Sequence, residues 1–110
     1  DVFVKSKRMD SKTDNYRFDK DGNINGWDDI ETFRIEVKNT RNLPVKLEIK
    51  RHFSTQYWTI KNLNDSQNYF ETVDLDTIKY TLTLEAQSEK TIDYIVTFFQ
   101  GARSADWKAN

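Results

Sequence analysis

Scarce residue types limit the chemistry open to this 110-residue chain. It has no cysteine, which excludes disulfides, thiolate metal sites and cysteine nucleophiles. Its one histidine, His52, lies beside Arg51 in a predicted strand with no nucleophile for a partner. The chain also lacks a Gly-x-Ser-x-Gly elbow, a phosphate loop and a His-Glu-x-x-His motif. We therefore expect no catalytic residues and no enzymatic activity.

A strong net charge and a long apolar run are also missing. Lysine and arginine number 17 against 18 acidic residues, for a net charge of −1, which favours neither a nucleic acid nor a membrane surface as partner. No signal peptide or membrane-spanning segment is recognisable. The length fits one domain, expected to be monomeric in isolation. Because the chain starts at Asp1, we expect a domain of a larger protein or a mature chain, with an extracytoplasmic or envelope location favoured.

What the chain does have is apolar residues alternating with polar ones. This period of two is typical of strands with one buried and one wet face. Several such strands in a short chain predict an all-β fold, an antiparallel β-sandwich of about seven strands. The clearest predicted strands are 31–38, 45–53, 77–85 and 91–99, with shorter ones at 56–60 and 69–73.

The remaining segments are polar. Residues 5–17 are predicted to be a loop, and Asp, Asn and Gly at 19–26 give the strongest turn signal. If 31–38 and 45–53 form a hairpin, electrostatics favours Ile35 opposite Leu47, by about 0.2–1 kcal/mol per charge pair. Successive strands crossing between sheets is the open alternative.

These assignments divide the chain into three parts. Residues 1–29 are an N-terminal strand and a polar, acidic loop, 30–100 are the sandwich core, and 101–110 are expected to be a frayed tail that Trp107 can pin. The predicted core residues are Phe33, Ile35, Val37, Val45, Leu47, Ile49, Trp58, Ile78, Tyr80, Leu82, Ile92, Tyr94 and Val96.

The strand motifs resemble a known type of module. They are Phe33-x-Ile35-x-Val37-x-Asn39, Pro44-Val45-x-Leu47-x-Ile49, Tyr57-Trp58-x-Ile60, Thr77-Ile78-Lys79-Tyr80 and Lys90-Thr91-Ile92-x-Tyr94-x-Val96. Over about residues 30–100 the chain resembles immunoglobulin-like or fibronectin-like accessory domains of bacterial and archaeal proteins. It is most similar to the C-terminal domain of unknown function of mucoidy-inhibitor-like proteins. The resemblance implies an immunoglobulin-like β-sandwich within a larger, often envelope-associated protein, and it carries over no catalytic residue.

The Asp- and Gly-rich loop is the one candidate metal site. With Gly22 at the sixth position of a calcium loop, the candidate calcium ligands at positions three, five, seven, nine and twelve are Asp19, Asp21, Asn23, Asn25 and Asp28. This spacing resembles the loops of dockerins and EF-hands. Arg17 occupies the first position, where a carboxylate belongs, and a strand rather than a helix follows. The alternative is an Asx- and Gly-rich turn whose side chains cap their own backbone.

Two function hypotheses remain. The leading one is a non-catalytic accessory module that spaces, orients or docks other domains of its parent protein or another protein. The alternative is a carbohydrate-binding module with a calcium-binding loop, in which exposed aromatic side chains stack on sugar rings. A row of tryptophan and tyrosine on one exposed sheet face would favour the alternative, whereas buried aromatics would favour the first. No organic cofactor is indicated.

Overall fold

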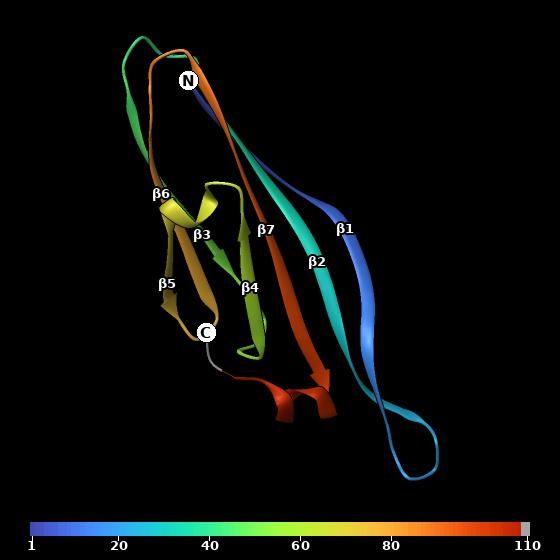
Figure 1. Ribbon diagram of the computed structural model, residues 1–110. Coiled ribbons are helices and arrows are strands. Elements are labelled where there is room, and N and C mark those ends of the chain that lie inside the picture. The colour runs from blue at the N-terminus through green and yellow to red at the C-terminus, as the bar shows by residue number, and fades with distance from the viewer. Residues whose placement is uncertain (109–110) are drawn as a thin grey trace.

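The computed structural model describes residues 1–108 and contains seven strands and two short 3-10 helices (Figure 1). Both helices fall far short of the length and apolar character that a membrane-spanning helix needs. The elements are β1 (Val2–Phe18), β2 (Ile24–Asn39), β3 (Val45–His52), β4 (Trp58–Leu63), η1 (Ser66–Tyr69), β5 (Phe70–Asp74), β6 (Thr77–Leu84), β7 (Ser88–Gly101) and η2 (Ala102–Asp106).

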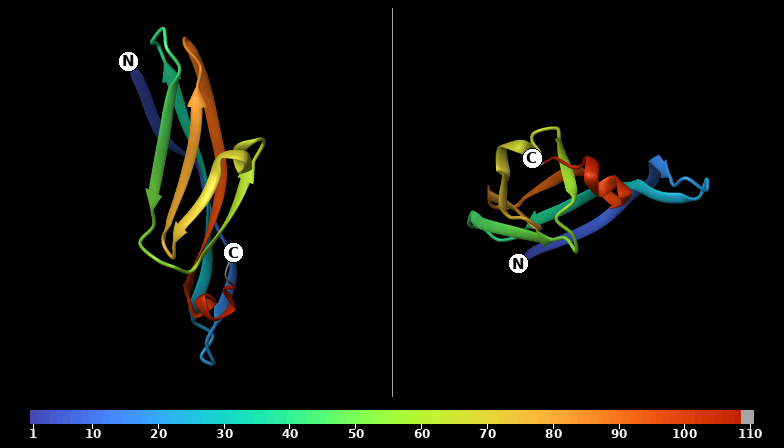
Figure 2. Two further views of the ribbon diagram at one scale, coloured as in Figure 1. Left: turned by 90° about the vertical axis from the view of Figure 1, so that its left-hand side faces the viewer. Right: turned by 90° about the horizontal axis from the view of Figure 1, so that it is seen from below.

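The strands form two antiparallel sheets, with the orders β1-β2-β7-β4 and β3-β6-β5. The smaller sheet lies against part of the larger one, and the β1–β2 hairpin extends beyond both (Figure 2). The domain is therefore long and narrow, with extents of 63 × 24 × 21 Å. The predicted all-β architecture, with about seven strands in two antiparallel sheets, is confirmed.

The core lies between the two sheets. Nine predicted core residues are buried, and the other four, Phe33, Val45, Leu47 and Ile49, are partly buried against them. Aromatic rings connect the layers, with Tyr80 of β6 and Tyr94 of β7 at 5.6 Å between centroids. Burial raises the pKa of both phenols. The core also includes Phe53 and Leu84.

The predicted loop at 5–17 is wrong, because these residues belong to β1. This edge strand pairs with β2 along its whole length and has no buried side chain. Its charged residues form ion pairs with the neighbouring strand, including Lys7 Nζ to Glu36 Oε1 at 2.7 Å and Arg8 Nη1 to Glu31 Oε1 at 3.0 Å. A strand without a buried face shows no apolar alternation, so its composition indicated a loop.

The hairpin considered for residues 31–38 and 45–53 does not form. Ile35 lies opposite Ser6 and Ile92, whereas Leu47 lies opposite Leu82 in the other sheet. β2 and β3 instead lie in different sheets, which is the alternative that the sequence left open. The connecting turn is fixed by Asn39, which is buried and whose Nδ2 donates to the backbone oxygens of three residues, Leu43, Leu84 and Glu85.

The tail is ordered in the described part of the chain, and its last two positions, Ala109 and Asn110, lie outside the described residues. Gly101 ends β7, and η2 turns back beside β2. The indole Nε1 of Trp107 donates to the backbone oxygen of Trp58 at 2.7 Å, which confirms that Trp107 pins this segment.

Two glycines let η2 approach β2 closely. Gly101 has φ 54° and ψ −131°, which side-chain-bearing residues rarely adopt, and an added Cβ would lie 2.3 Å from the backbone oxygen of Asn25. At Gly26 an added Cβ would lie 2.7 Å from the backbone nitrogen of Arg103. The backbones therefore meet where neither strand has room for a side chain.

We expect Gly101→Ala to lower the free energy of unfolding by about 3 kcal/mol, because strain and overpacking add at this position. Gly22→Ala is the control: Gly22 also has a positive φ, of 81°, but nothing lies within 4 Å of an added Cβ. It should cost about 1 kcal/mol. Urea denaturation measures both, and equal losses would contradict the close approach.

Candidate functional site

The Asp- and Gly-rich loop forms the turn of the β1–β2 hairpin. The Asp19 Oδ1 accepts the backbone N–H groups of Asp21 and Asn23, each at 2.9 Å. The backbone N–H of Gly22 donates to the backbone oxygen of Asp19 at 3.0 Å, and Gly22 takes the left-handed conformation. This is the capped turn that the alternative to a calcium loop requires.

The structure brings only some of the predicted calcium ligands together. Asp19, Asp21 and Asn23 share the turn, whereas Asp28 lies farther along β2, opposite Asp14. Asn25 stands between them, at an irregularity of the β1–β2 pairing. Among residues 1–108, no group of three or more acidic or histidine side chains is placed to hold a metal ion. A calcium site here stays a prediction that needs the loop to rearrange.

Asp28 instead anchors the C-terminal segment. Its side chain is 2% exposed and receives two hydrogen bonds from Arg103, Nε to Oδ1 at 2.8 Å and Nη2 to Oδ2 at 2.9 Å. Asn15, at a positive φ in β1, donates its Nδ2 to the same Oδ2 at 2.8 Å. The buried carboxylate is thus paired and hydrogen-bonded, as burial of a charge requires.

The ion pair extends into a network that we call the C-terminal clamp, made of Arg17, Asp28, Arg103 and Asp106. Arg103 Nη1 donates to Asp106 Oδ2 at 2.9 Å, and Arg17 donates to the same oxygen. Arg17 and then Arg103 hold the pKa of Asp106 below its ordinary value of 3.8. The clamp ties η2 to both strands of the hairpin, so its residues serve the fold.

Each tryptophan in the described residues contacts other parts of the protein. Trp58 is buried, and its Nε1 donates to the backbone oxygen of Leu75 at 2.9 Å. Trp27 donates to Asp29 at 3.1 Å, and Trp107 packs edge-on against Tyr57 at 5.6 Å between centroids. In the part of the chain that the structure describes, all three indoles therefore contact the protein itself, and no tryptophan is fully exposed.

The remaining ionisable candidates also have structural surroundings. His52 is exposed, with its Nδ1 3.0 Å from Thr77 Oγ1. Asp74 and Asp76 lie at the β5–β6 turn, where Asp74 Oδ1 accepts the backbone N–H of Asp76 at 3.2 Å. Asp74 is exposed and Asp76 is partly buried. No buried side-chain polar atom lacks a partner among residues 1–108.

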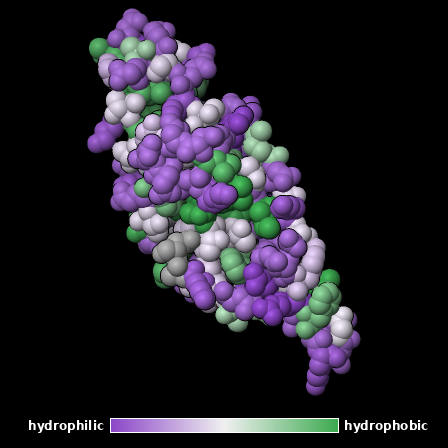
Figure 3. Space-filling view, viewed as in Figure 1, coloured by the Kyte–Doolittle hydropathy of each residue, from purple (hydrophilic) through white to green (hydrophobic). Residues whose placement is uncertain are grey.

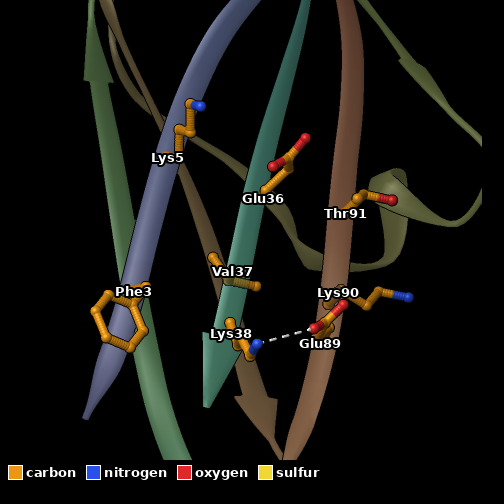
Figure 4. Close-up of a pocket in the computed structure, with 8 residues that line it drawn as sticks. All are labelled: Phe3, Lys5, Glu36, Val37, Lys38, Glu89, Lys90 and Thr91. Carbon is orange, nitrogen blue, oxygen red and sulfur yellow. Dashed lines mark ion pairs between the residues drawn. The ribbon is translucent and has the colours of Figure 1, made fainter. Parts of the chain in front are cut away.

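The outer face of the larger sheet carries cross-strand ion pairs. Arg34 Nε lies 2.7 Å from Asp93 Oδ1, and Lys38 Nζ lies 3.5 Å from Glu89 Oε1. An open cavity of about 640 Å³ lies here, between β1, β2 and β7 (Figure 4). Its lining is Phe3, Lys5, Glu36, Val37, Lys38, Glu89, Lys90 and Thr91. Positive and negative side chains alternate along the cavity, so it offers no continuous basic surface for the phosphates of a nucleic acid.

Exposed apolar side chains gather on β1 and its hairpin, which sequence reasoning missed. The structure has nine exposed large hydrophobic residues, and six lie in this hairpin: Phe3, Val4, Met9, Tyr16, Phe18 and Ile24. Phe18 and Ile24 lie opposite each other next to the turn. The hairpin projects from the body of the molecule, with apolar surface close to its tip (Figure 3). These side chains are distributed along both faces of the hairpin, from Phe3 near its open end to Phe18 and Ile24 next to the turn.

We expect Arg103→Leu to lower the free energy of unfolding by about 3 kcal/mol, because it leaves the Asp28 carboxylate buried without its cation. Arg17→Leu is the matched control. Its side chain is 52% exposed, against 16% for Arg103, and its ion pair should contribute at most about 1 kcal/mol. Urea denaturation measures both, and similar losses would contradict a dominant role for Asp28.

Calcium binding can be tested against the capped turn by thermal unfolding of the wild type and Asp19→Ala. If the turn is only capped, several millimolar calcium leaves the wild-type Tm unchanged, and Asp19→Ala loses about 1 kcal/mol with or without the ion. If the loop rearranges around calcium, the ion raises the wild-type Tm by mass action and leaves the variant's unchanged. The structure favours the first outcome, because Arg103 already holds Asp28.

Comparison with known proteins adds no assignment to this geometry. No family model, no curated protein and no solved structure matches the chain. The resemblance to immunoglobulin-like accessory domains stays a prediction, and the function has to be inferred from the arrangement of the residues.

Proposed function

We propose that this chain is a non-catalytic accessory module that docks onto another domain or protein through its β1–β2 hairpin. We also propose that its two-sheet sandwich is of the immunoglobulin-like type. The observation that carries the docking function is that six of the nine exposed large apolar side chains in the described residues belong to this one hairpin. The smaller sheet has fewer such side chains: Val73 of β5 and Leu75 of the β5–β6 turn are exposed, whereas Val45, Leu47 and Ile49 of β3 pack against the core.

The construction of the domain supports this proposal. The ionisable groups that a sequence search would single out for chemistry are used in structural pairs, above all Asp28 with Arg103. The core and the C-terminal clamp hold both strands of the hairpin at its base. A rigidly held hairpin that extends beyond the sandwich can present its side chains to a partner at little cost in conformational entropy.

The tryptophans favour docking over the carbohydrate-binding alternative, because Trp58 is buried and Trp27 and Trp107 are partly buried. Stacking on sugars needs exposed aromatic faces in a row, whereas each indole N–H here donates a hydrogen bond to another group of the protein. The exposed aromatics of the hairpin are Phe3, Tyr16 and Phe18, which are spread along an edge strand and its tip.

Photo-crosslinking in the cells that make the chain tests the docking function. A benzophenone side chain replaces Phe3 or Phe18 in two variants, and Leu75 or Leu43 in two controls. Leu75 is 67% exposed and Phe18 62%, so exposure is matched. We expect covalent adducts at the hairpin positions in several-fold excess over the controls. Equal yields at all four positions, or adducts only at Leu75 or Leu43, would contradict the proposal.

A further inference from the structure

The first part of β1 is an open sheet edge. β1 pairs only with β2, and the pairing is regular over Val2–Arg8. Beyond it the register shifts at Met9 and again around Asn15 and Tyr16. Bulges of this kind twist an edge away from further pairing, and they protect the later part of the strand. Val2–Arg8 has no such protection.

The hydrogen-bonding pattern shows which backbone groups point outward. The backbone N–H of Thr40 donates to the Asp1 oxygen at 2.9 Å, so Asp1 and Thr40 form a hydrogen-bonded pair of the antiparallel ladder. Such pairs alternate with pairs whose backbone groups point away from the partner strand. The N–H and C=O groups of Val2, Val4, Ser6 and Arg8 therefore face the open edge.

The side chains of this segment have different chemistry on the two faces. Even-numbered residues share the core face, because Val4 lies opposite Val37 and Ser6 opposite Ile35. On this face Val2 and Val4 are apolar, and Val4 is half-exposed. Odd-numbered residues share the outer face, where Phe3 and Lys5 line the cavity of Figure 4 and Lys7 pairs with Glu36 of β2. The segment has no acidic residue.

This charge pattern selects the partner. A second copy paired antiparallel through the same segment would place Lys5 against Lys5, and like charges opposite each other are unfavourable. A strand with acidic side chains on the outer face and apolar side chains on the core face would complement both faces. It would meet Lys5 on the outer face, beside the Lys7–Glu36 pair, and cover Val2 and Val4 on the core face.

We propose that the Val2–Arg8 edge of β1 binds an extended acidic–apolar segment of a partner protein, which adds to the larger sheet as a fifth strand next to β1. This inference rests on the proposed docking function and specifies its mode. Main-chain hydrogen bonds to Val2, Val4, Ser6 and Arg8 give the affinity, and the lysines of the outer face give the specificity.

The first experiment uses a synthetic peptide of about nine residues, a common strand length, in which glutamate alternates with valine. Amide hydrogen exchange is followed by NMR on the full chain. On saturation, the amides of Val4, Ser6 and Arg8 should exchange at least about tenfold more slowly, whereas those of Lys5 and Lys7, already bonded to β2, should change little. A peptide with lysine for each glutamate should bind at least about tenfold more weakly. Protection only at β3, β4 or β5, or equal binding of both peptides, would overturn the proposal.

Two variants test the mode independently. Ser6→Pro removes an outward N–H and leaves the β2 ladder intact, so the peptide should bind at least about tenfold more weakly, while Ser6→Ala should bind like the wild type. Lys5→Glu should weaken the glutamate peptide and strengthen the lysine peptide. If Ser6→Pro fails to fold, Lys5→Glu decides alone, and unchanged affinity in it overturns the proposal. Crosslinking at Phe18 together with no peptide binding would reject this mode and keep the docking function.

Discussion

The pairing of β2 with β7 is the constraint on which the rest of the structure depends. The two strands are in register without a break from Gly26 opposite Gly101 to Asn39 opposite Ser88. β1 adds to one side of this pair and β4 to the other, and the inward side chains of the pair form the surface on which the smaller sheet packs. A buried polar side chain stabilises each end, Asn39 beside the β6–β7 turn and Asp28 beneath η2. Both are fully hydrogen-bonded, so they specify how the chain leaves the ladder without burying an unpaired group.

How much of this fold the sequence predicts depends on whether a strand has a buried face. The strands around Ile35, Ile78 and Ile92 alternate because one of their faces is inaccessible to solvent, and all three were placed correctly. β1 has no buried side chain, so its apolar and polar residues follow no pattern that a search for alternation can detect. β1 is extended because it pairs with β2, and the sequence of β1 alone does not reveal that pairing. The wrong partner for Ile35 has a similar origin: cross-strand charges are worth a fraction of a kcal/mol per pair, whereas the choice of sheet is decided by burial of the whole apolar face.

The candidate metal site shows a different limit of sequence reasoning. Ligand spacing in the loop suggests that Asp19 and Asp28 converge, but spacing contains no information about competing partners. The Asp19 carboxylate accepts hydrogen bonds from the backbone N–H groups two and four residues later, as the turn signal already implied. The Asp28 carboxylate pairs with Arg103, which is 75 residues away in the chain, and only the folded structure brings the two together. Gly26 and Gly101, which allow the close approach at this contact, are also far apart in the sequence, and their pairing becomes apparent only once the register of β2 and β7 is known.

An exposed sheet edge needs an explanation, because natural sheets usually protect their edges against unwanted pairing. β1 has two kinds of protection: irregularities beyond Met9, and cations along its whole length. The cations act differently from the irregularities. An irregularity blocks every incoming strand, whereas Lys5 and Lys7 repel strands of like charge, including the same edge of another copy, and leave the backbone groups of Val2–Arg8 free. Because the regular part of the edge has only the selective kind of protection, it disfavours self-association while remaining able to accept a strand of opposite charge. That combination is expected of an edge used for recognition rather than one that is merely tolerated.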